Sequence, residues 1–340
     1  MVMIGIDPHK GSHTAVAVGS DESVLCETRV RACSTQLQRL SEWASQFDER
    51  VWAVESAGGL GYLLSQQLVS AGEVVFDVPP VLSARVRLLG SGRSQKNDPN
   101  DARSVAIAAL RSDRLNRVVA SDHSTVLAML AKRHRDLAQF RAKSANRLHA
   151  LLVELEPGGI GSRITTNKAI AVLDRVEVTN AVVAQRCEIA YEIVADIVDL
   201  DDRLKASRKR VETAVAASGT CLCDIVGVGP IGAAMIIGAV GDIDRFKTKA
   251  QFASFNATAP VEASSGERAR HRVNLRGNRR VNSVIYRAAI TQIGRDTPGR
   301  AYYDRKRTEG KNHKEALRCL MRQISNNVYR HLVADQHNTQ

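Results

Sequence analysis

Two aspartates three residues apart, Asp98 and Asp101, stand at the head of an apolar run with helical spacing. On the first turn of a helix, this spacing projects both carboxylates from about one face. Further upstream, Asp7 and Glu55 each close a strand-like segment. Strand ends and a helix start can bring four carboxylates together, and such a cluster repels itself unless divalent cations neutralise it. The pattern therefore predicts a divalent metal site.

Each acid also has a simpler interpretation. An Asp at a helix start often caps the helix, and a lone Asp after a strand often belongs to a turn. The order of all four acids along an alternating strand and helix pattern favours the metal site instead.

The composition indicates a polyanionic partner. The 340 residues suffice for two or three domains, and 44% of them are hydrophobic, so real cores can form. Lys and Arg number 48 against 36 acidic residues, and the resulting net charge of +12 favours a polyanion. Aromatic residues make up only 4%, which predicts phosphate contacts in place of extensive base stacking. A metal site in such a basic protein suggests phosphodiester chemistry.

The sequence also indicates the cellular compartment of the protein. No apolar run reaches the roughly 18 residues needed to span a bilayer, and the first seven residues predict a strand in place of a signal peptide. The six cysteines lack zinc-site spacing, and free thiols fit a reducing cytoplasm. We expect a cytoplasmic protein with no membrane partner.

Residues 1–120 alternate between strand and helix signals, which predicts an α/β domain with a mixed sheet and helices on its faces. The first three strands follow one another as in a meander. Residues 79–99 are rich in Arg, Ser and Gly and predict a basic loop that leads to the Asp pair. Strands are expected at 2–6, 14–18, 24–27, 51–54 and 74–78, and helices at 36–44, 62–71 and 101–111.

Residues 121–217 contain no strand signal and two long series of apolar residues at helical spacing. This pattern predicts an antiparallel helical hairpin or coiled-coil arm, with an ordinary helical bundle as the alternative. The first helix carries Arg133, Arg141 and Arg147, which could follow a nucleic-acid backbone. A charged helix face is more often simply solvated.

Residues 218–340 open with a Gly-rich turn, Gly227-Val228-Gly229-Pro230, which has the signature of a helix-hairpin-helix element. Gly227 and Gly229 permit a tight turn whose N–H groups can approach a phosphate. The alternative is a Gly-rich helix start.

A second candidate site follows, where six arginines fall within thirteen residues. Arginine forks bind phosphate oxygens at two points and keep their charge at any working pH. Ser264 and Ser265 precede this cluster, and a serine there could attack a phosphodiester while arginines stabilise the transition state. Taken alone, Ser-Ser-Gly also fits a flexible polar turn. The arginines are Arg268, Arg270, Arg272, Arg276, Arg279 and Arg280.

Tyr302 and Tyr303 are competing nucleophiles, because they follow Arg270-His271-Arg272 at a distance similar to that in tyrosine recombinases. Their alternative role is packing at a helix start. A phosphotyrosine mechanism would need no metal and would leave the four acids unexplained, so we favour the serine.

Taken together, these residues resemble the DEDD-type insertion-sequence transposase family. This is the "one-ten" group, associated with bridge-RNA-guided recombination and including relatives of the Piv DNA invertase. The resemblance covers nearly the whole chain and departs only at residues 256–259, where many members have Gly-Leu before the proline. Its motifs are Ile4-Gly5-Ile6-Asp7-Pro8-His9-Lys10, Glu55, Lys96-Asn97-Asp98-Pro99-Asn100-Asp101-Ala102, Gly227-Val228-Gly229-Pro230, Ser265-Gly266 and Gly310-Lys311-Asn312-His313-Lys314-Glu315-Ala316.

The resemblance implies a RuvC-like, RNase H-type N-terminal domain whose Asp7, Glu55, Asp98 and Asp101 hold Mg²⁺. It implies a mainly helical C-terminal transposase domain with Ser265, which directly precedes the glycine, as the nucleophile. A covalent phosphoserine link would conserve bond energy while donor and target DNA are joined. A structured noncoding RNA would select both DNAs by base pairing. A homodimer or homotetramer would complete the sites, in a bacterial cytoplasm and associated with the nucleoid.

Three interpretations stay open. The preferred one is a transposase or site-specific recombinase, and a DNA invertase would use the same residues. The second is a metal-dependent nuclease of the resolvase type, in which Ser265 is only structural. The third is an ATPase of the actin and sugar-kinase type, since Gly5-Ile6-Asp7 with Ser12 and Thr14 resembles a first phosphate loop. That interpretation requires a second Asp-Gly-rich loop, which the sequence lacks.

Overall fold

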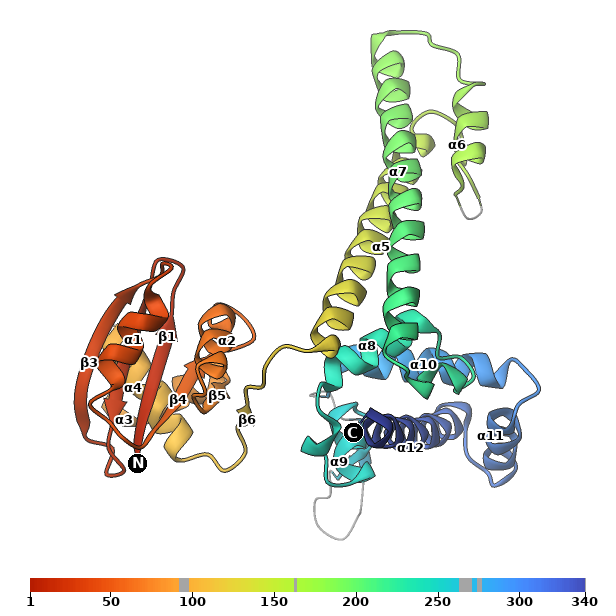
Figure 1. Ribbon diagram of the computed structural model, residues 1–340. Helices are drawn as coiled ribbons and strands as arrows, with labels where there is room; N and C mark the ends of the chain where they lie inside the picture. Colours follow the sequence, from red (N-terminus) through yellow and green to blue (C-terminus); the bar gives the residue numbers. More distant parts are fainter. Residues whose placement is uncertain (92–97, 162–163, 263–270, 274–276, 340) are drawn as a thin grey trace. The chain divides into compact units, whose positions relative to one another are not determined.

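The computed structural model describes residues 1–91, 98–161, 164–262, 271–273 and 277–339 (Figure 1). The chain divides into two compact units, Met1–Ser121 and Asp122–Gln340. The expected division into 1–120, 121–217 and 218–340 stays a prediction. Within the described ranges, no helix is both long enough and apolar enough to cross a membrane.

The first unit is built on a mixed six-stranded sheet with the strand order β3-β2-β1-β4-β5-β6. β1 pairs antiparallel with β2 and parallel with β4, and β5 lies parallel to β4. The mixed sheet, its opening meander and its five expected strands are confirmed, and β6 is an addition. The strands are β1 (Val2–Pro8), β2 (Ser12–Val18), β3 (Val24–Arg31), β4 (Arg50–Glu55), β5 (Val75–Val78) and β6 (Asn116–Arg117).

Helices cover both faces of this sheet, and alternation along β1 sends side chains to two separate cores. Ile4 and Ile6 belong to the core shared with α1 and α2, whereas Met3 belongs to the core shared with α3 and α4. Because successive strand side chains point to opposite faces, Asp7 lies on the α4 face with Met3. The helices are α1 (Gln36–Ala44), α2 (Tyr62–Ser70), α3 (Pro80–Ser91) and α4 (Asp98–Leu110).

Gly5 lets helix α4 lie directly on the backbone of β1. A Cβ at this position would lie 2.1 Å from the carbonyl oxygen of Ala102 and 2.6 Å from the amide nitrogen of Ala106. Glycine inside a strand often marks such a close approach of another backbone. The approach brings the first turn of α4 to the end of β1, where Asp7 stands.

The expectation of a basic loop at residues 79–99 is wrong, because Pro80–Ser91 of this segment form helix α3. Pro80 is its first residue, where the missing N–H removes no helical hydrogen bond. Leu82 and Val86, one turn apart, pack against the α4 core. Their burial stabilises a helix in a segment whose Arg, Ser and Gly content suggests a loop. Helix α4 also begins earlier than expected, at Asp98, so both aspartates lie in its first turn.

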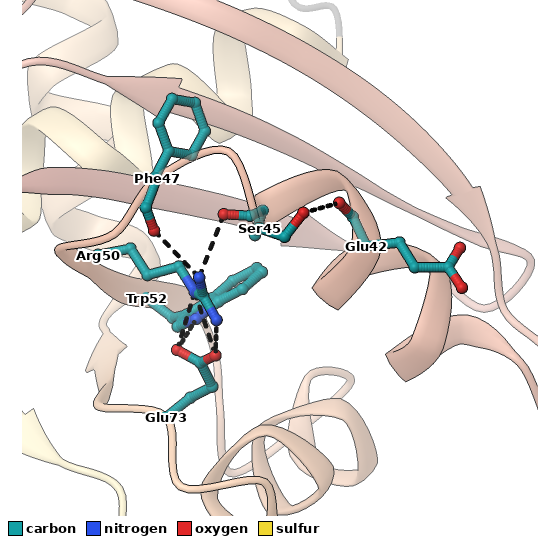
Figure 2. A network of polar contacts seen from close by, with 7 residues as sticks. Glu42, Ser45, Phe47, Arg50, Trp52 and Glu73 are labelled. Atoms are coloured by element: carbon teal, nitrogen blue, oxygen red, sulfur yellow. Dashed lines mark hydrogen bonds and ion pairs between the residues drawn. The ribbon is translucent and has the colours of Figure 1, made fainter.

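A polar network fixes the start of β4, the strand that ends at Glu55 (Figure 2). Arg50 donates to both carboxylate oxygens of Glu73 at 2.5–3.2 Å and to the carbonyl oxygen of Phe47 at 3.0 Å. The indole N–H of Trp52 also donates to Glu73, at 2.7 Å. Trp52 is fully buried, so this carboxylate satisfies a donor that has no access to water.

The second unit opens with two long helices, α5 (His123–Val153) and α7 (Ala181–Ala217), which run antiparallel side by side (Figure 1). Leu127 near the start of α5 shares a core with Val211 near the end of α7. Leu148 shares another core with Ile193 at the opposite ends of the two helices. Two long helices in this region were expected, and coiled-coil packing between them stays a prediction.

The remainder of this unit is mainly helical, as expected. The Gly-rich turn joins a short 3-10 helix, η1, to α8, and the helix-hairpin-helix motif stays a prediction. The elements are α6 (Thr166–Leu173), η1 (Cys221–Asp224), α8 (Pro230–Val240), η2 (Ile243–Arg245), α9 (Lys249–Phe255), β7 (Pro260–Glu262), β8 (His271–Val273), α10 (Arg279–Ile293), α11 (Pro298–Thr308) and α12 (His313–Thr339).

Candidate metal centre

The four predicted acids converge on the α4 face of the first unit. Asp7 is 5% exposed at the end of β1, and Asp101 is 8% exposed in the first turn of α4. Burial raises the pKa of Asp7; His9 opposes this shift, and the negative charges of Glu55, Asp101 and Asp98 add to it. Carboxylates that shift one another's pKa lie close in space, so the fold brings together the acids that the sequence selected.

Each carboxylate also has a partner that the sequence did not identify. Nε2 of His9 lies 3.2 Å from Oδ2 of Asp7 and 3.5 Å from Oδ1 of Asp98. Arg29 on β3 approaches the other oxygen of Asp98 at 3.4 Å.

Two further partners come from helix α3. Arg87 forms an ion pair with Asp101, and the hydroxyl of Ser83 donates to Glu55. These residues lie four apart, so both face the same side of the helix. The sequence gives no local sign of these two partners, because the Arg, Ser and Gly content of residues 79–99 is typical of a loop. His9 had a local signal, since it stands two residues after Asp7, and side chains at that spacing along an extended chain share a face.

An open hollow of about 520 Å³ lies beside Asp98. One of its lining residues is Thr14, which lies directly opposite Asp7 in the β1–β2 pairing. The buried hydroxyl of Thr14 has no hydrogen-bond partner within the described part of the chain. Buried hydroxyls are normally satisfied, so an unsatisfied one here fits the wall of a binding site. The lining residues are Thr14, Glu27, Thr28, Arg29, Asp98 and Pro99.

The donor set suits a divalent cation. Asp7, His9 and Asp98 offer ligand atoms that all lie within 4.8 Å of one another. Carboxylate oxygens are the ligands that hard divalent cations prefer. Burial is the main cause of the raised pKa of Asp7, and a bound dication would offset the repulsion from the neighbouring carboxylates that adds to it. By charge and by ligand chemistry, the residues present fit such an ion.

The serine candidates Ser264 and Ser265 lie outside the described residues, as do Arg268, Arg270 and Arg276. Arg272 lies on β8, opposite Val261 of β7. Arg279 and Arg280 are exposed in the first turn of α10.

The described residues on both sides of the serine segment, residues 263–270, are hydrogen-bonded to each other and to α12. The fully buried Asn256 donates from Nδ2 to the hydroxyl of Ser325 on α12 at 2.8 Å. Asn282 on α10 donates to the carbonyl oxygen of Asn256 at 2.9 Å. The N–H of Asn278 donates to the carbonyl oxygen of Phe255 at 2.6 Å. The end of α9 and the start of α10 are therefore fixed to each other.

Basic side chains gather where α5, α8 and α10 meet. Lys132 and Arg135 of α5 line a hollow of about 330 Å³ together with Arg279 and Arg280. The predicted nucleic-acid ligands on α5 differ from one another. Arg133 and Arg147 are exposed, whereas Arg141 forms an ion pair at 2.5 Å with Asp201 of α7.

The two predicted hairpin glycines have different surroundings. Gly227 has a φ of +90°, and a Cβ there would lie 2.7 Å from Cα of Ala288 on α10. A Cβ at Gly229 would meet no atom within 4 Å among the described residues. Gly227 thus allows the turn to pack closely against α10, whereas the backbone at Gly229 has free space beside it among the described residues. Their contact with phosphate stays a prediction.

The tyrosines have structural partners. Tyr303 is 9% exposed, and its hydroxyl lies 2.6 Å from Nδ1 of His313. Tyr302 packs against the main core of this unit, with Arg305 and Lys306 over its ring. These contacts favour the packing role over a nucleophilic one.

Two family models match the chain. One for DEDD IS110 proteins, described as "Transposase", matches residues 4–157, and the "Transposase IS116/IS110/IS902 family" matches residues 219–304. The "Insertion element IS116 uncharacterized 44.8 kDa protein" of Streptomyces clavuligerus is 29% identical, over 94% of this chain and 92% of the relative. The "Probable family 20 transposase" of Pseudomonas aeruginosa is 25% identical, over 84% of this chain and 82% of the relative. Thermus thermophilus RuvC is similar over 35% of this chain and 100% of its own, with a TM-score of 0.28 and 18% identity.

Proposed function

Because the chain belongs to the IS116/IS110/IS902 family and is therefore a DNA transposase, we propose that it joins donor and target DNA through a covalent phosphoserine intermediate. The observation that carries this proposal is the convergence of Asp7, Glu55, Asp98 and Asp101 on one face of the first unit. We assign this unit to the RuvC-like class, the long helices to a coiled-coil arm, and the Gly-rich turn to a helix-hairpin-helix element.

The four acids hold divalent cations in this proposal, with Mg²⁺ as the ion that their oxygens suit. The ion, when bound, supplies positive charge that favours an ionised hydroxyl and stabilises the oxygen that leaves phosphorus. Arg87 orients Asp101, and Ser83 orients Glu55. Holding each carboxylate in one rotamer keeps the ligands in position before DNA arrives.

Ser265 is the proposed nucleophile. Its hydroxyl oxygen forms a bond to a DNA phosphorus, the bond from that phosphorus to a deoxyribose oxygen breaks, and the proton that serine gives up ends on the deoxyribose oxygen that leaves. In the second step, a sugar hydroxyl of the other DNA attacks the phosphoserine and releases Ser265. One phosphate ester replaces another at each step, so no external energy source is needed. The paired ends of α9 and α10, held through Asn256 and Asn278, give this segment a fixed base.

The basic surfaces bind nucleic acid in this proposal. Exposed Arg133 and Arg147 would follow a phosphate backbone along α5, and Arg279 and Arg280 would bind near the serine segment. Such contacts supply affinity without reading sequence. We assign the choice of donor and target to a structured noncoding RNA, and the completion of each site to a homodimer or homotetramer.

A plasmid recombination assay with a matched serine pair tests the proposal. Ser265→Ala and Asp101→Asn should each abolish joining of donor and target, while Ser264→Ala should recombine as the unmodified protein does. Circular dichroism and RNA binding should be unchanged in all three variants. If Ser265→Ala recombines normally, the serine mechanism is wrong.

A metal-dependent nuclease of the resolvase type is the second candidate function. One observation favours it, since the four acids come together within the first unit alone. A nuclease would release DNA ends free of protein and would not need Ser265. Detection of free ends only, at full rate in Ser265→Ala, would select this function. A DNA invertase would use the same acids and serine as the transposase.

A further inference from the structure

His9 gives the acid cluster a nitrogen donor, and nothing in the proposed function uses it. Its Nε2 lies 3.2 Å from Asp7 and 3.5 Å from Asp98, two acids that come from β1 and α4. The three ligand atoms lie within 4.8 Å of one another. A ring nitrogen at this point faces the same small volume as both carboxylates.

The backbone holds His9 in this position. Pro8, directly before it, has a restricted φ, and the N–H of His9 donates to the carbonyl oxygen of Ser12 at 2.9 Å. The side chain is 45% exposed, so the ring reaches the buried Asp7 from the solvent side. The turn between β1 and β2 therefore points this ring at the acids.

His13, on the same hairpin, provides a contrast. It is 5% exposed, and its Nε2 lies 3.1 Å from the side-chain oxygen of Gln36 on α1. The Nε2 of this histidine is paired inside the protein, on the other side of the sheet from Asp7, whereas its buried Nδ1 has no hydrogen-bond partner among the described residues. Of the two rings on this hairpin, His9 is the one that faces the carboxylates.

We propose that His9 is a ligand of the cation that Asp7 and Asp98 bind, and that it biases the site toward Mn²⁺ and other transition-metal ions over Mg²⁺. Imidazole nitrogen binds transition-metal ions well, whereas Mg²⁺ prefers oxygen ligands and retains water. A neutral imidazole presents a lone pair to a cation at the point where the two carboxylates meet. The inference rests on the proposed metal site and adds a residue and a metal preference to it.

Pulsed electron paramagnetic resonance on the full-length protein loaded with Mn²⁺ tests the assignment directly. We expect modulation from a directly bound ¹⁴N nucleus, absent in His9→Asn and retained in the control His123→Asn, which alters an exposed histidine on α5. By calorimetry, the Kd for Mn²⁺ should rise at least about tenfold in His9→Asn, and the Kd for Mg²⁺ should rise less. His9→Gln is a second variant, with circular dichroism as the check on folding.

The outcomes separate this inference from the proposed function. If Mn²⁺ binds and Asp7→Asn abolishes binding, but no ¹⁴N modulation is present, His9 is only an ion-pair partner and the metal site stands. Equal loss of Mn²⁺ and Mg²⁺ affinity in His9→Asn would overturn the metal preference. If the unmodified protein binds no divalent ion, the inference and the proposed metal site both fail.

Discussion

Replacing Gly5 with alanine tests how the metal site is assembled. The new methyl group would lie 2.1 Å from the carbonyl oxygen of Ala102 and 2.9 Å from Cβ of Ala106. Ordinary contacts start at 3.4 Å, so the difference from 2.1 Å requires α4 to retreat from β1 by about 1.3 Å at that point. The movement would carry Asp98 and Asp101 away from Asp7.

Both stability and metal binding should respond to this change. Overpacking a well-packed interior costs about 1–3 kcal/mol, which for a unit of this size corresponds to roughly 4–12 °C in Tm. Metal affinity should fall as well, because ligands must be held to within about 0.5 Å of their productive geometry. Scanning calorimetry with and without Mn²⁺ measures both effects.

Gly11→Ala is the matched control for this experiment. Gly11 lies in the turn after β1, and a Cβ there would meet no described atom within 4 Å. We expect it to melt and to bind metal as the unmodified protein does. If Gly5→Ala matched Gly11→Ala in both Tm and metal affinity, then α4 does not rest on the β1 backbone and the account of the site's assembly is wrong.

Three further changes address the polar network, the acid cluster and the Gly-rich turn. Glu73→Gln should lower the free energy of unfolding by about 1–3 kcal/mol in urea titrations, because buried Trp52 and charged Arg50 lose a carboxylate acceptor. Burial and neighbouring carboxylates raise the pKa of Asp7 in the folded state, so folding favours its protonated form. The contribution of Asp7 to the free energy of unfolding is therefore complete below a pH of about 3.8 and is lost as the pH rises through the raised pKa. Asp7→Asn should therefore raise the Tm of the metal-free protein at neutral pH but not in acid, and an equal gain at both would refute the assignment. Gly227→Ala should lower the Tm of the second unit while Gly229→Ala leaves it unchanged, since only the first has positive φ and a close neighbour.

The acids could be predicted because their signals are local. A strand that ends near Asp7, a strand that ends in Glu55 and a helix that follows the Asp98 and Asp101 pair are each readable from periodicity within a few residues, although the helix begins three residues earlier than expected. The alternation of β1 then places Asp7 on the face that α4 covers. Gly5 was also readable as an unusual residue in a strand, although the helix that rests on it belongs to a distant part of the sequence.

The partners of the acids could not be predicted, because they depend on tertiary contacts. Ser83 and Arg87 act from α3, a helix that burial of Leu82 and Val86 stabilises against a loop-like composition. His9 gains its role only when α4 brings Asp98 beside it, across nearly ninety residues of sequence. Local sequence patterns identify the residues at the end of a strand or the start of a helix, whereas tertiary packing determines which other side chains contact them.

Mass spectrometry of a trapped adduct shows whether a serine of this transposase becomes covalently attached to DNA. The full-length protein, with its noncoding RNA and a divalent ion, would be incubated with a DNA substrate whose cleaved end cannot be rejoined. After digestion, we predict a nucleotide attached to the peptide that carries Ser265, and none in Asp101→Asn. An adduct on Tyr302 or Tyr303, or efficient cleavage with no adduct, would show that Ser265 is not the nucleophile.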